Sequence, residues 1–198
     1  RLLQEFLVSE NFELQSGVDD MSTAFVATSG SGFPTIAILA EFDALPGLSQ
    51  EALPYREVRE LGASGHACGH HLFGSASVTA GALLARWLKK SGFDGTIKVI
   101  GTPAEEGGSG KVYLARAGVF DDVDTVLHWH PSDVNSAAPY STTANKSGRF
   151  TFTGKAAHAA SAPDQGRSAL DGVEAMNYMV NLMREHIPQE SRIHYVIT

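Results

Sequence analysis

The chain has 198 residues, of which 43% are hydrophobic and 19% are charged, a composition typical of folded globular proteins. Its net charge of −7 and its lack of a basic cluster argue against nucleic acid or an anionic membrane surface as a partner. Its one cysteine makes no internal disulfide, no signal peptide is visible and no apolar run is long enough to span a bilayer, so we expect a cytoplasmic protein.

The first part of the chain alternates predicted strands and helices. The predicted strands lie at 12–14, 23–27, 35–40, 96–100 and 123–131. The predicted helices lie at 2–10, 72–90 and 112–117. The run at 35–40 is apolar throughout, which favours a strand buried on both faces of a parallel sheet. The order of elements predicts an α/β fold with a mostly parallel sheet flanked by helices.

Acidic residues follow two of these strands. Glu41 and Asp43 come at the end of the buried strand, where open α/β sheets place their active sites, although ordinary loop acids are an alternative. Glu105 and Glu106 follow the next predicted strand, and two adjacent carboxylates are costly unless a cation or a proton offsets their repulsion. One of them could bind a metal while the other acts as general base, and a surface turn is the alternative.

Histidines and the only cysteine supply softer ligands. Cys68 and His70, separated by one glycine, can turn toward the same divalent ion. They lie at the start of a predicted helix, where the macrodipole is expected to lower the pKa of the thiol. His128 and His130 lie two apart on a predicted strand and would face the same side. The alternatives are a buried structural cysteine and structural histidines.

The sequence changes character near residue 144. A strand predicted at 149–153, a helix with Ser168 as its N-cap and a strand predicted at 193–197 form a different, α+β unit. We therefore expect two domains, 1–144 and 145–198. Because the chain starts at Arg1 and ends within a strand-like pattern, we expect a fragment of a longer protein.

Five motifs occur in a characteristic order. They are Asp-Ala-Leu-Pro-Gly at 43–47, His-Ala-Cys-Gly-His at 66–70, Pro-Ala-Glu-Glu-Gly-Gly at 103–108, Leu-His-Trp-His-Pro at 127–131 and Gly-Lys-Ala-Ala-His-Ala at 154–159. Together they resemble the M20-type metallo-amidohydrolases, and most closely the aminobenzoyl-glutamate hydrolase and N-acyl amino acid amidohydrolase branch. The resemblance implies two divalent ions, zinc or manganese, a catalytic domain over 1–144 and the start of a truncated lid or dimerisation domain over 145–198.

The resemblance also implies a role for individual residues. The metal ligands would be Cys68, His70, Glu106 and one of His128 and His130, between which the motif does not decide. The other roles would be Glu105 as general base, Asp43 as the residue that orients a ligand, and His158 as a donor to the oxyanion across a homodimer. Other branches carry His-x-Asp where this chain has Glu41-Phe42-Asp43, so Glu41 is not assigned as a ligand. A further histidine ligand, supplied after the lid in relatives, lies outside this chain.

The sequence thus predicts a metal-dependent hydrolase. Its substrate would be a small N-acylated amino acid or dipeptide of the aminobenzoyl-glutamate type, whose amide is attacked by a metal-activated water. Two alternatives stay open, a thiol hydrolase with Cys68 as nucleophile and a non-catalytic metal-binding or dimerisation module. The exact substrate and the metal are not determined by these patterns.

Overall fold

The chain divides into two compact units. The computed structural model describes residues 1–137 and 141–198, which group into Arg1–Asn135 and Ser136–Thr198. The domain limits 1–144 and 145–198, and the catalytic and lid roles given to them, stay predictions. Within the described residues, no helix has the length and apolarity that a membrane span requires.

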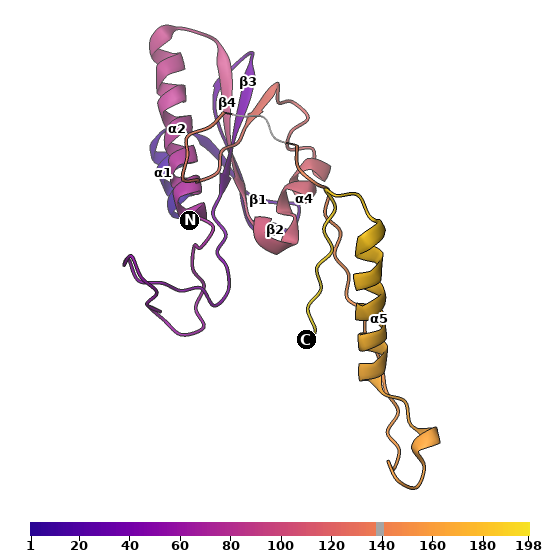
Figure 1. Ribbon diagram of the computed structural model, residues 1–198. Helices are drawn as coiled ribbons and strands as arrows, with labels where there is room; N and C mark the ends of the chain where they lie inside the picture. Colours follow the sequence, from indigo (N-terminus) through magenta and orange to yellow (C-terminus); the bar gives the residue numbers. More distant parts are fainter. Residues whose placement is uncertain (138–140) are drawn as a thin grey trace. The chain divides into compact units, whose positions relative to one another are not determined.

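A mixed sheet forms the centre of the first unit (Figure 1). Its strands are β1 (Glu13–Val18), β2 (Met21–Ser31), β3 (Thr35–Glu41), β4 (Gly95–Thr102) and β5 (Thr125–Leu127). They lie in the order β1-β2-β4-β3-β5. β1 and β4 run antiparallel to β2, whereas β3 runs parallel to both β4 and β5. The parallel strands therefore end at the same edge of the sheet, and the predicted α/β class is confirmed.

Helices cover both faces of this sheet (Figure 1). They are α1 (Leu2–Ser9), α2 (His70–Ser91) and α4 (Gly110–Arg116), and the short α3 (Glu105–Gly108) lies between β4 and α4 in the chain. Leu7 of α1 and Val78 of α2 pack with Ile38 in one buried cluster, and Leu114 of α4 packs with Leu39 in another. The neighbouring residues Ile38 and Leu39 of β3 thus enter opposite cores, which explains why the strand is apolar from Ile36 to Ala40.

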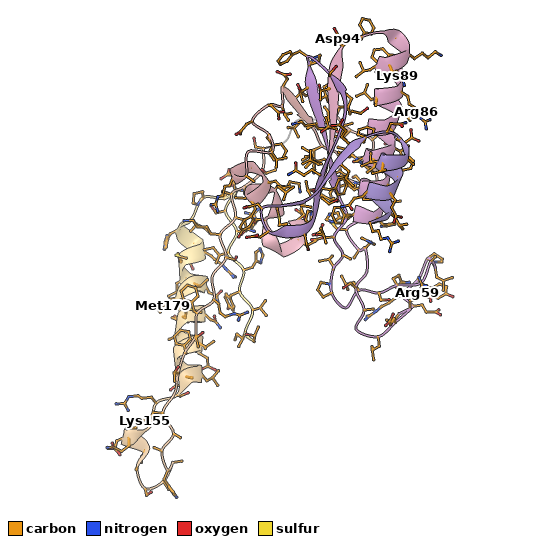
Figure 2. The ribbon with its side chains drawn as sticks, turned by 180° about the vertical axis from the view of Figure 1, so that it is seen from behind. Arg59, Arg86, Lys89, Asp94, Lys155 and Met179 are labelled. Atoms are coloured by element: carbon orange, nitrogen blue, oxygen red, sulfur yellow. The ribbon has the colours of Figure 1, made fainter. Side chains whose placement is uncertain are left out.

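Two glycines in the left-handed conformation set the limits of α2. Gly69 precedes the helix with φ of 77°, so the helix begins at His70, two residues before the predicted start. Gly92 follows the helix with φ of 69°, and its N–H donates to the carbonyl of Leu88 at 3.0 Å. Lys89 lies in the last turn as predicted, at the end of α2 where Figure 2 labels it. The early start places His70 in the first turn of a helix.

The second unit contains one long helix, α5 (Ala169–Met183). The short 3-10 turns η1 (Pro163–Gln165) and η2 (Arg184–His186) lie on either side of it in the chain. The predicted cap is confirmed, because Ser168 Oγ accepts the N–H of Asp171 at 3.1 Å.

The two strands predicted for this unit are wrong. Among the described residues, neither 149–153 nor 193–197 takes part in a strand ladder, and the pairing found in the unit is an isolated bridge between Lys155 and Arg167. An alternating pattern supplies one face of a strand, but a strand also needs a neighbouring backbone to bond.

Candidate metal centre

The candidate site lies at the edge where the three parallel strands end. Glu41 is the last residue of β3, Glu105 opens α3 shortly after β4, and His128 directly follows β5. In the ladder Glu41 is paired with Thr102. The second turn of α2 approaches the same edge closely, since a Cβ on Gly74 would lie 2.7 Å from the carbonyl oxygen of Glu41. Parallel pairing therefore gathers segments that are far apart in the sequence.

His70 lies at the centre of this group and its side chain is 0% exposed. Its Nδ1 is 2.9 Å from Asp43 Oδ1, and because a carboxylate oxygen accepts, Nδ1 carries the proton. The other ring nitrogen, Nε2, faces the acidic side chains. It lies 3.0 Å from Glu41 Oε2, 3.9 Å from Glu106 Oε1 and 4.0 Å from Glu105 Oε2. Three carboxylates thus surround Nε2, a concentration of negative charge that a bound cation would offset.

The contact between His70 and Glu41 makes no hydrogen bond. Although Nε2 and Oε2 are only 3.0 Å apart, both are buried and neither has a hydrogen-bond partner among the described residues. A buried acceptor without a donor costs roughly 1–3 kcal/mol. A cation between the two atoms would satisfy both.

Cys68 and His130 form the second half of the site. Sγ of Cys68 lies 3.4 Å from Nε2 of His130, whose Nδ1 is 3.0 Å from the carbonyl oxygen of Pro131. The carbonyl only accepts, so Nδ1 again holds the proton and Nε2 faces the sulfur. Cys68, His70 and His130 offer ligand atoms that all lie within 4.8 Å of one another. Glu41, His70 and Glu105 form a second such group, and the two groups share His70.

The other oxygen of Glu41 is held by positive or donor groups. Oε1 accepts a hydrogen bond from Lys111 and lies 3.2 Å from Nε2 of His128. Burial by itself raises the pKa of Glu41, but the hydrogen bonds from His128 and Lys111 and the charges of Lys111 and His70 outweigh it and lower the pKa to about 2. Sequence patterns gave no role to Lys111, because it lies 70 positions from Glu41 and no motif connects the two residues.

The sequence has clear relatives. The profile of Peptidase family M20/M25/M40 matches residues 37–189. The chain belongs to this family. The predicted resemblance is confirmed, and a subunit of p-aminobenzoyl-glutamate hydrolase from Escherichia coli (strain K12) is 44% identical over 197 residues, 99% of this chain and 41% of that protein. Xaa-Arg dipeptidase of Mus musculus is 36% identical over 82% of this chain and 34% of that protein. The chain thus spans about two fifths or less of these curated relatives.

Solved structures agree with the M20/M25/M40 assignment. The Bacillus subtilis YXEP protein, described as a dinuclear metal binding peptidase from the M20 family, is 29% identical with a TM-score of 0.55, over 66% of this chain and 36% of that one. A structure from methicillin resistant Staphylococcus aureus is 26% identical with a TM-score of 0.64, over 93% of this chain and 50% of that one.

The donor atoms of this M20/M25/M40 chain fit a divalent ion. Two ligand atoms of one tetrahedral zinc ion, bound at about 2.0–2.3 Å, lie roughly 3.3–3.8 Å apart. The separation of 3.4 Å between Cys68 Sγ and His130 Nε2 falls within that range, and the separation of 3.0 Å between His70 Nε2 and Glu41 Oε2 lies slightly below it. Because Asp43 and the Pro131 carbonyl accept from Nδ1, Nε2 is the nitrogen that each histidine leaves for a metal.

The structure separates the two histidines that the motif left open. β5 ends at Leu127, so His128 and His130 do not lie on the strand that was predicted to direct them to the same side. His128 is turned to Glu41, whereas His130 joins Cys68 and His70. Glu106 lies outside both ligand groups, although its N–H donates to Asp43 Oδ2 at 3.0 Å.

The predicted lowering of the Cys68 pKa is wrong. Burial raises the pKa of this thiol, and the nearby carboxylates of Glu106, Glu105 and Glu41 raise it further. The effect of burial and of the nearby negative charges on the thiol pKa thus outweighs that of the helix terminus, because few positive groups of the protein stabilise the thiolate. A divalent ion at this position would reverse the balance.

Proposed function

We propose that this chain is the metal-binding part of an amidohydrolase that cleaves the amide bond of a small N-acylated amino acid or dipeptide. The observation that carries the proposal is the buried contact of His70 Nε2 with Glu41 Oε2, neither of which has a hydrogen-bond partner within the described residues, beside Cys68 and His130. These four side chains bring nitrogen, oxygen and sulfur ligand atoms close together and so form a site for cations. Membership of the M20/M25/M40 family supports hydrolysis as the reaction.

In this proposal Cys68, His70, Glu106 and His130 would hold two divalent ions, zinc or manganese, and Glu41 would face the ion held by His70. Bound ions of this kind polarise a scissile carbonyl and make a nearby water nucleophilic at neutral pH. Glu105 accepts the proton of that water and delivers it to the leaving amine. Its Oε2 lies 4.0 Å from His70 Nε2, so this carboxylate would be close to an ion that His70 holds.

Two further residues act without holding the ions. Asp43 orients His70 through Nδ1 and also accepts the N–H of Glu106, so one carboxylate links two ligand segments. His158 accepts the N–H groups of Ala160 and Ser161 at Nδ1, at 3.2 and 3.1 Å, so its neutral ring carries the proton on Nε2. We propose that this N–H donates to the oxyanion, within a homodimer formed through 145–198.

The substrates to test come from the relatives. Two relatives are named p-aminobenzoyl-glutamate hydrolase and Xaa-Arg dipeptidase. The compounds in these names share an amide bond to an amino acid. We propose the same chemical class here, with p-aminobenzoyl-glutamate as the first compound to assay.

The first experiment measures metal content by mass spectrometry on the purified protein. We expect about one or two divalent ions per chain, and their loss in a Cys68→Ala/Glu106→Ala variant. Glu105→Gln should keep the ions while hydrolysis of p-aminobenzoyl-glutamate falls by roughly 10²–10⁴-fold. Activity that survives a chelator but is lost on alkylation of Cys68 would indicate a thiol hydrolase. Bound metal without turnover would indicate a non-catalytic module.

A further inference from the structure

Trp129 lies between the two histidines and is tied to α2. Its Nε1–H donates to Ser77 Oγ at 3.1 Å. Ser77 is 1% exposed, whereas Trp129 is 39% exposed. The indole therefore keeps an outer edge at the surface while its one polar group reaches a buried hydroxyl on α2, which anchors the ring to the helix.

Phe73 provides the surface on which this segment rests. It lies one turn before Ser77 on α2 and is 0% exposed. The rings of His128, Trp129 and His130 lie edge-on to it, with centroid distances of 5.0, 5.5 and 6.2 Å. The ring of His70 meets Phe73 in the same way at 6.3 Å. One buried phenyl ring thus contacts four rings of the site in the edge-to-face arrangement that aromatic pairs favour.

The sheet does not hold His130 in place. The β5 ladder ends at Leu127, before either histidine of the pair. The Nδ1 bond of His130 goes to Pro131 in its own segment, so it orients the ring without anchoring the segment. The segment reaches α2 through its ring contacts with Phe73 and His70 and through the Trp129 bond to Ser77. Pro131 also approaches Gly69, directly before the helix, where an added Cβ would lie 3.1 Å from the proline ring.

We propose that Trp129 is a positioning residue of the metal centre. Its bond to Ser77 and its packing on Phe73 hold the segment so that His130 faces Cys68 while His128 turns to Glu41. This inference rests on the proposed metal site and explains why one histidine of the pair becomes a ligand. Trp129 is the residue between the two histidines. When its indole is held on α2, the backbone on either side is held too, and this sets the direction of both histidine side chains.

The test uses Co²⁺ as the metal, because its absorption reports both affinity and ligand geometry. Trp129→Phe keeps an aromatic ring against Phe73 but removes the N–H donor. We expect Co²⁺ binding to weaken roughly tenfold, the lower end of the cost of losing an outer partner of a metal ligand. We also expect a changed thiolate-to-cobalt absorption band, which general loss of stability would not alter.

The matched control is Trp87→Phe, the same chemical change elsewhere on α2. Trp87 stacks on Phe93 at 5.7 Å near the end of the helix that carries Arg86 and Lys89 (Figure 2). Its position near the C-terminal end of α2 places it roughly 25 Å along the helix from His70. We expect this variant to keep the affinity and the spectrum of the unchanged protein.

Ser77→Ala removes the other partner of the bond. If the bond positions the segment, Ser77→Ala and the double variant with Trp129→Phe should weaken Co²⁺ binding to the same extent as Trp129→Phe alone. Ser77→Ala carries the test if Trp129→Phe fails to fold. Unchanged Co²⁺ affinity and spectrum in these variants, or an equal loss in Trp87→Phe, would overturn the inference. Failure of the unchanged protein to bind Co²⁺ would instead overturn the proposed function on which it rests.

Discussion

Asp43 offers the sharpest test of the metal centre, because its two oxygens have separate duties. Oδ1 accepts the N–H of His70 at 2.9 Å, and Oδ2 accepts the backbone N–H of Glu106 at 3.0 Å. In Asp43→Asn one oxygen is replaced by an NH₂ group, which donates. Whichever way the amide turns, one donor then faces another donor, and one of the two bonds is lost.

The expected size of the effect follows from two independent scales. A hydrogen bond to a charged group contributes roughly 1.5–3 kcal/mol. Loss of an outer partner of a ligating histidine weakens metal binding by roughly 10–100-fold, which is about 1.4–2.7 kcal/mol. Because the scales agree, we expect Asp43→Asn to weaken Zn²⁺ binding by roughly 10–100-fold.

The assay is competition for Zn²⁺ against a coloured chelator. Asp124→Asn is the matched control, since Asp124 Oδ2 accepts the N–H of Thr35 at 2.7 Å, at the opposite end of β3 from Glu41. That variant should bind Zn²⁺ as the unchanged protein does. A Zn²⁺ affinity of Asp43→Asn equal to that of Asp124→Asn would refute the view that Asp43 supports a ligand.

Two further predictions concern stability. In chelator, the pKa of Glu41 of about 2 lies below its ordinary 4.5, so its contribution to the free energy of unfolding is present above about pH 4.5 and is lost as pH falls toward 2. Urea unfolding across that range should therefore depend less steeply on pH in Glu41→Gln, and equal slopes would contradict this. Ser168→Ala should destabilise the start of α5 by about 0.5–2 kcal/mol, and unchanged hydrogen exchange at Asp171 would contradict the cap.

Elements with local signals could be predicted from the amino-acid sequence. The unbroken apolar run predicted β3, and Lys89 with Gly92 predicted the end of α2, because a helix end depends on residues within one turn. Ser168 predicted the start of α5 for the same reason. The ligand pairs closest in the chain, such as Cys68 with His70, were visible as motifs because a short segment limits how far apart their side chains can lie.

Properties that depend on residues far apart in the sequence were decided only by the tertiary structure. Glu41 meets Lys111 across 70 positions, and Cys68 meets His130 across 62, so neither contact has a local pattern. Distant partners also decide two results that differ from the sequence predictions. One is the raised pKa of Cys68, and the other is the lack of strand ladders, among the described residues, at 149–153 and 193–197. The pKa of a group depends on every charge and dipole that surrounds it, and a strand depends on the backbone beside it, whereas a sequence pattern records only what lies nearby in the chain.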